Sequence, residues 1–226
     1  MQTVQKEVNS RMAEVELYLK FIREIERSPQ SGARLFPSAV QSAPIFKACT
    51  FLLLYNLVES CVRSAFEQTY SEMLGEEIVY ADISKEIKQV WIKQQFHTPA
   101  DTATQGTYLL LASEIATLIS EGKSVSLDSR KLPVSGNLDG DRIRSLCHKH
   151  GVKLTVPKWA KGGAELTTIK DQRNALAHGH KSFSECGREY GVRDLERIYR
   201  QTRHFIFGFL KSVSRFNARR EYRVAN

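Results

Sequence analysis

Two side chains suited to acid-base and anion chemistry lie close together near residue 175. Arg173 carries a permanent positive charge, and His178 belongs to the residue type that changes protonation most readily near neutral pH. Asn174 precedes His178 by four positions, so the two share a face if the segment is helical. We expect His178 to end this helix, where free carbonyls favour an imidazolium and so suit it for proton transfer.

Arg173 occupies an unusual position for a charged residue. Leu166, Ile169 and Leu176 recur at helical spacing, and Arg173 falls where that stripe requires an apolar side chain. A guanidinium in such a place is costly unless it is paired. The stripe therefore predicts either a carboxylate partner or an opening into a site or an interface.

A polar series interrupts an apolar run earlier in the chain. Asn56, Glu59 and Arg63 are spaced three and four positions apart, within and just after the run FLLLYNLVES. We expect Glu59 or Asn56 to hold Arg173. The alternative is that Arg173 makes a structural salt bridge and that His178 only ends its helix.

Hydrophobic periodicity predicts a helical protein. Expected helices span residues 4–25, 43–74, 83–96, 108–119, 141–150, 164–178 and 192–216. The region 122–163 differs, because residues 125–127 and 152–156 alternate at period two and favour short strands. The expected fold class is therefore all-α, a single domain over residues 1–226 built as a helical bundle, with a small mixed α/β insertion at about 122–163.

Composition excludes several classes of protein. The 226 residues are 42% hydrophobic and 26% charged, unlike disordered, collagen-like or coiled-coil chains. The segment MQTVQKEVNS has no apolar signal core, and the longest apolar run, residues 45–58, is interrupted by Lys47, Thr50 and Asn56. We therefore expect a cytoplasmic protein that does not associate with membranes.

Metal and cofactor motifs are weak in this sequence. The four cysteines form no C-x-x-C pair and are expected to be reduced thiols. Cys147, His148 and His150 could ligate zinc, but no second pair follows at zinc-finger spacing. No glycine-rich phosphate loop is present either. We expect neither a metal ion nor a cofactor.

Positive charge is concentrated at the end of the chain. The formal net charge is +8, and the last thirty residues hold eight Lys and Arg against one acidic residue, a balance of +7. Clustered cations favour a polyanionic partner, because binding to phosphates releases condensed counterions. A solvated helix face that happens to use arginine remains the alternative.

Three segments resemble a known family. RNALAH resembles the R-N-x-x-x-H signature of the HEPN superfamily of helical-bundle ribonucleases and defence toxins. The segments FLLLYNLVES and GHKSFSECGREYGVRDLERI resemble the MAE-type and RiboL-PSP branch of the same superfamily. The resemblance implies metal-independent RNA cleavage in a composite cleft between two protomers.

This resemblance gives each residue an expected role. Arg173 and His178 become the catalytic pair, with Asn174 orienting the histidine or contacting RNA, and with Glu59, Asn56 and His180 in support. The cations expected to position the RNA backbone are Lys170, Lys181, Arg197, Arg200 and Arg203. RNA would supply its own 2′-hydroxyl nucleophile, and the products would be a 2′,3′-cyclic phosphate and a 5′-hydroxyl.

The resemblance also suggests partners and alternatives. It implies a homodimer acting as a toxin or anti-phage effector, with a possible antitoxin or co-encoded defence protein. A second hypothesis is a non-catalytic RNA-binding or regulatory HEPN module in which Arg173 and Glu59 are structural. A third is a dimeric scaffolding bundle with neither activity.

Overall fold

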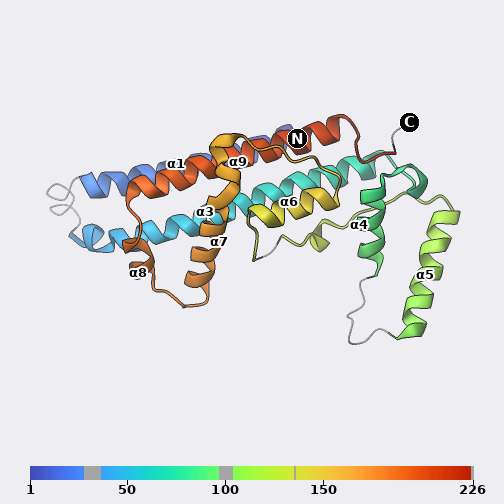
Figure 1. Ribbon diagram of the computed structural model, residues 1–226, viewed down its shortest axis with the longest axis horizontal. Coiled ribbons are helices and arrows are strands. Elements are labelled where there is room, and N and C mark those ends of the chain that lie inside the picture. Colours follow the sequence, from blue (N-terminus) through green and yellow to red (C-terminus); the bar gives the residue numbers. More distant parts are fainter. Residues whose placement is uncertain (28–36, 97–103, 135, 225–226) are drawn as a thin grey trace. The chain divides into compact units, whose positions relative to one another are not determined.

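The chain is almost entirely helical in the computed structural model, which describes residues 1–27, 37–96, 104–134 and 136–224 (Figure 1). The α-helices of this part of the chain are α1 (Gln2–Arg27), α3 (Pro37–Gly75), α4 (Lys85–Gln95), α5 (Gln105–Ser120), α6 (Gly140–Lys149), α7 (Ala164–Ala177), α8 (Phe183–Arg188) and α9 (Val192–Ala218). Short 3₁₀ turns occur at η1 (Tyr80–Asp82), η2 (Ser129–Lys131) and η3 (Lys158–Gly163). The predicted all-α class is confirmed.

The predicted strands do not form, so the expectation of a mixed α/β insertion was wrong. Across the described ranges no strand occurs, and the extended pairing consists of two isolated bridges, Val79 with Ser124 and Ile83 with Arg223. Thr155 N–H donates instead to the Ser212 hydroxyl of α9 at 3.0 Å. Extended segments can bury alternate side chains against helices, so period-two alternation arises without a β-ladder.

The chain divides into two compact units. The first comprises residues 1–62, 134–143 and 156–209, and the second comprises residues 63–133, 144–155 and 210–226. Helices α3 and α9 each contribute residues to both units. The single domain expected from the sequence stays a prediction.

Amphipathic patterning determines the packing of α1 in the first unit. Steps of three and four place Val4, Val8, Met12, Val15, Leu19, Ile22 and Ile25 on one face, and all of these residues except Ile25 are buried. Hydrogen bonds join α1 to α3 and α9, since the Tyr18 hydroxyl donates to Phe46 O and the Tyr199 hydroxyl to Glu16. The apolar stripe therefore faces the two long helices of this unit.

Helix α8 packs closely against α3 in the first unit. It begins with a capping box, in which the Ser182 hydroxyl accepts from Glu185 N–H and the Glu185 carboxylate accepts from Ser182 N–H. A Cβ added at Gly187 would lie 1.7 Å from Pro44 O. Only glycine allows the two backbones to approach this far.

A buried histidine joins α6 to α3 in the second unit. The Nδ1 atom of His150 lies 2.8 Å from Leu146 O, and its Nε2 atom lies 2.6 Å from the Tyr70 hydroxyl. A carbonyl only accepts, so Nδ1 carries the proton and Nε2 accepts from Tyr70. Burial lowers the pKa of His150 to about 4. His150 is therefore a neutral core residue, and no group of metal-binding side chains occurs in the part of the chain that the structure describes.

Glu76 anchors the C-terminal segment in the second unit. Its carboxylate accepts hydrogen bonds from the Tyr222 hydroxyl at 2.9 Å and from Arg223 at 2.7 Å. Ser84 N–H donates to Tyr222 O, and Val224 N–H donates to Asp82 O. Residues 222–224 are thus fixed to Glu76, which directly follows α3, and to the segment that precedes α4.

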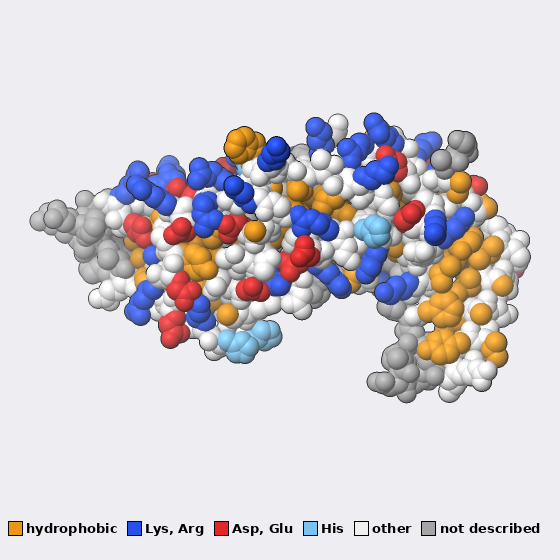
Figure 2. Space-filling model, viewed as in Figure 1, with side chains coloured by type: hydrophobic (Ala, Val, Ile, Leu, Met, Phe, Trp, Pro, Cys, Tyr) orange, Lys and Arg blue, Asp and Glu red, His pale blue; other side chains and the backbone are white. Residues whose placement is uncertain are grey.

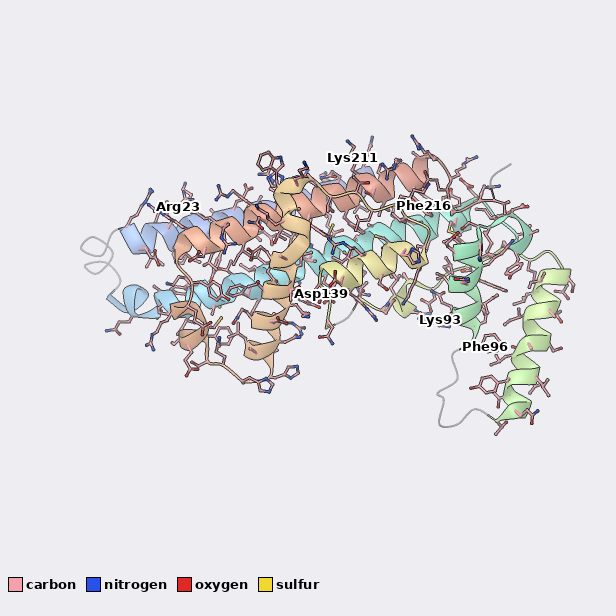
Figure 3. All side chains as sticks on the ribbon, viewed as in Figure 1. Arg23, Lys93, Phe96, Asp139, Lys211 and Phe216 are labelled. Carbon is pink, nitrogen blue, oxygen red and sulfur yellow. The ribbon has the colours of Figure 1, made fainter. Side chains whose placement is uncertain are left out.

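Helix α5 of the second unit exposes much of its apolar surface. No residue of α5 is buried, and Leu109 and Leu110 are 66% and 68% exposed. Apolar side chains gather over this helix in Figure 2. At the end of α4, Phe96 packs against Tyr108 with ring centroids 6.4 Å apart (Figure 3).

One helix is long and apolar enough to cross a membrane by composition. The span covers residues 41–75 of α3, with a mean hydropathy of 1.5 in its most apolar window. Half of that window is buried inside the protein. The core helix of a bundle satisfies the same criterion, so this feature is weak evidence for a membrane span.

Candidate active site

Helix α7 and the turn after it place the predicted catalytic residues. The turn is a Schellman motif, in which Gly179 has φ 69° and donates to Leu176 O, while His180 N–H donates to Ala175 O at 2.9 Å. His178 is the C-cap residue, as predicted, and both histidines are exposed. Their ring centroids lie 5.8 Å apart. The backbone therefore fixes two imidazoles together on the surface.

Arg173 lies half-buried between α7 and α3. Its guanidinium carbon lies 4.6 Å from the centroid of the Tyr55 ring, and Nη1 donates to Asn174 Oδ1 at 2.8 Å. An aromatic face and an amide oxygen thus stabilise the charge that interrupts the apolar stripe. Sequence periodicity identified the anomalous position but did not identify Tyr55.

Tyr55 connects Arg173 to Glu59. The Tyr55 hydroxyl accepts from Leu138 N–H at 3.2 Å and hydrogen-bonds the Glu59 carboxylate. Burial raises the pKa of Tyr55, and the negative charge of Glu59 raises it further. Glu59 therefore joins the Arg173 cluster through Tyr55, whereas Asn56 accepts a hydrogen bond from Arg11 at 2.7 Å.

The segment before α6 supplies further polar groups to this cluster. Asn174 Nδ2 donates to Asn137 Oδ1 at 3.1 Å, and Lys170 Nζ lies 2.8 Å from Asp139 (Figure 3). Burial alone would raise the pKa of Asp139, but hydrogen bonds from Lys170 and from Arg142 N–H lower it. This segment lies in the region 122–163, where the sequence predicts an insertion.

Tyr55, Asn137 and Asp139 are site residues that sequence reasoning missed. The only local signal for Tyr55 is its position four residues before Glu59, which places the two side chains on one helical face. Asn137 and Asp139 lie in the run SGNLDG, which is typical of a turn and gives no indication of its neighbours.

Most of the cations expected to hold RNA are already paired. Four of the five lie beside carboxylates: Lys170 with Asp139, Lys181 with Glu189, Arg197 with Glu165, and Arg203 with Glu16. The fifth, Arg200, is exposed. Basic and acidic side chains are interspersed over these helices in Figure 2. RNA binding by these residues would have to compete with internal ion pairs.

A comparison with protein families matches residues 1–222 to the MAE-type HEPN family. The chain belongs to this family. Searches of the curated proteins and of the solved structures found no match. Membership of the HEPN family suggests a ribonuclease or nucleotide-related function.

One HEPN chain presents Arg173 and His178 on different sides of α7. Five positions along an α-helix correspond to a rotation of roughly 140° about its axis. Arg173 accordingly packs on the Tyr55 ring, whereas His178 is exposed at the end of the helix. The arrangement offers an anion-binding guanidinium and a surface pair of imidazoles, with no metal-binding cluster among the described residues.

Proposed function

We propose that this HEPN protein is a metal-independent endoribonuclease whose catalytic residues are Arg173 and His178. The observation that carries the proposal is that the R-N-x-x-x-H segment lies on one helix, with its histidine exposed and its arginine held beside a polar cluster. Family membership supports the same class of reaction.

The proposed reaction uses the 2′-hydroxyl of RNA as its nucleophile. His178 accepts the 2′-hydroxyl proton while that oxygen bonds to phosphorus, and the bond from phosphorus to the 5′-oxygen breaks. An imidazolium returns a proton to the leaving 5′-oxygen. Arg173 holds the non-bridging oxygens with its planar fork, most strongly as charge develops in the transition state. The products are a 2′,3′-cyclic phosphate and a 5′-hydroxyl.

The proposed site is formed by two protomers. Proton removal and proton return need two groups, and the exposed His178 of each copy of a homodimer would supply one. The divergent directions of Arg173 and His178 within one chain support this arrangement, because a second copy can bring an arginine to the opposite histidine.

RNA cleavage with a chelator present tests the proposal. We expect EDTA to leave cleavage intact, and His178→Ala and Arg173→Ala to abolish it. Arg173→Lys keeps the charge but loses the bidentate fork, so it should retain little activity. The matched control is His148→Ala, which removes another exposed histidine. The proposal fails if the folded wild type leaves RNA intact, or if the His178 and Arg173 variants cleave normally.

A non-catalytic RNA-binding or regulatory HEPN module is the second candidate. One observation favours it, namely that Arg173 is engaged by Tyr55 and Asn174, as expected of a structural arginine. RNA binding without cleavage, with affinity unchanged in His178→Ala, would support the module. End-group analysis of the RNA separates the two candidates.

The biological role we propose is that of a toxin or anti-phage effector, held in check by an antitoxin or a co-encoded defence protein. This role rests on the family alone. Expression of the wild type should slow cell growth, and expression of His178→Ala at the same level should not. A wild type that leaves growth unchanged would contradict the toxin role.

A further inference from the structure

Trp159 is the most exposed of the large apolar side chains that the structure describes. It is 73% exposed and lies in η3, immediately before α7, within the first compact unit. Its sequence neighbours Pro157, Lys158 and Lys161 are also exposed, so the residues next to it in the chain do not cover the indole. Packing of the core of this unit therefore does not explain why a tryptophan occupies position 159.

The backbone that carries this indole is tightly constrained. Residues 161–163 all have positive φ, which is unfavourable for the lysine among them. Ala160 is fully buried and donates its N–H to Pro157 O at 3.0 Å. A Cβ added at Gly163 would lie 2.7 Å from the Phe205 ring. The turn thus packs firmly on α9 while the indole remains in solvent.

The charges around the indole indicate what it binds. Lys158 and Lys161 flank Trp159 in the sequence, and both are exposed. The cores of protein interfaces are depleted in lysine, whereas an aromatic ring beside cations is the combination that binds single-stranded nucleic acid. The ring stacks on a base and the cations meet phosphates.

We propose that Trp159 is a stacking platform for an unpaired base of single-stranded RNA. The proposal rests on the proposed function, in which RNA is the substrate, and it adds a preference for unpaired strands. Helix α7 has 14 residues and is therefore roughly 20 Å long, which separates Trp159 from His178. The indole would hold the strand several nucleotides from the bond that is cleaved, so it acts in binding and not in proton transfer.

Tryptophan fluorescence of the full chain tests this proposal directly. The chain has two tryptophans, and the other, Trp91, is only 5% exposed. A single-stranded 2′-deoxy oligonucleotide lacks the nucleophile and cannot be cleaved by the proposed reaction. We expect it to quench the emission, and a duplex of equal length to quench far less, because its bases are already stacked. Binding of the single strand without quenching would overturn the proposal.

Matched variants separate stacking from other roles. Trp159→Ala should weaken binding of the same oligonucleotide at least about five-fold, and Trp159→Phe should retain most of the affinity. Tyr108→Ala, which removes an exposed aromatic ring from α5, should have no effect. For RNA cleavage, Trp159→Ala should raise KM and leave kcat unchanged.

Two further outcomes distinguish this proposal from its alternatives. Unchanged affinity in Trp159→Ala would overturn the proposal. A dimer that dissociates in Trp159→Ala during sedimentation would place the indole in a protein interface and would also overturn it. Because the binding assay uses an uncleavable strand, a wild type without ribonuclease activity would refute the proposed function and leave the quenching result interpretable.

Discussion

Tyr55 is the side chain whose replacement tests the candidate site most directly. Its hydroxyl accepts from Leu138 N–H at 3.2 Å and bonds Glu59, and its ring lies 4.6 Å from the Arg173 guanidinium. Tyr55→Phe removes the hydroxyl and keeps the ring. Tyr55→Leu removes both groups, so the pair separates the two interactions.

The expected magnitudes follow from these contacts. Leu138 is only 1% exposed. In Tyr55→Phe the buried Leu138 N–H loses its acceptor, which lowers the free energy of unfolding by about 1–3 kcal/mol. Tyr55→Leu also loses the cation-π contact with Arg173, about 0.5–2 kcal/mol more. Both variants should cleave RNA more slowly, because Arg173 and the segment carrying Asn137 are less firmly held.

Urea unfolding followed by circular dichroism measures the stability of both variants, with Tyr108→Phe on exposed α5 as the control. A double-mutant cycle of Tyr55→Leu with Arg173→Met should give a coupling energy of about 0.5–2 kcal/mol. A Tyr55→Phe protein as stable as the wild type would refute the role of the hydroxyl. A coupling energy near zero would refute the role of the ring.

The remaining predictions concern buried groups away from the proposed catalytic pair. Burial lowers the pKa of His150 to about 4, so the unfolded chain binds more protons between pH 4 and 6.5. Stability should fall by about 3 kcal/mol as the pH drops through this window, measured by urea unfolding, and His150→Gln should flatten the profile while His148→Gln does not. Gly187→Ala places a methyl group 1.7 Å from Pro44 O and should cost about 3 kcal/mol or more in unfolding free energy, or prevent folding. Gly75→Ala, with nothing within 4 Å of the added Cβ, should be nearly neutral in the same assay, and equal stability of the two glycine variants would contradict the packing argument.

Local patterning was enough to predict the helices. The stripe of α9 that recurs at steps of three and four is buried at every position, namely Leu195, Ile198, Thr202, Phe205, Phe209, Val213 and Phe216. An amphipathic helix buries one face whichever element it packs against. Its hydrophobic period can therefore be recognised in the sequence without knowledge of that element. The prediction of strands was wrong because a β-strand forms only when a second segment pairs with it. Residues 152–156 have no such pairing partner.

The candidate site was only partly visible in the sequence. Two local features were informative. The interrupted stripe identified the unusual position of Arg173, and the glycine after His178 identified the end of α7. Tyr55 and Asp139 contact α7 from segments far away along the chain, and neither carries a local signal of that contact. The contact between the Tyr55 ring and Arg173 is likewise a property of packing.

Sequence alone is sufficient for the helical class, the buried faces, the end of α7 at His178 and the anomalous charge at Arg173, because each depends on neighbours within about two helical turns. Tertiary structure decided which groups hold that charge, which cations are already paired and which indole remains in solvent. Most of these outcomes depend on contacts between segments more than 30 residues apart, and one-dimensional periodicity carries no information about such contacts.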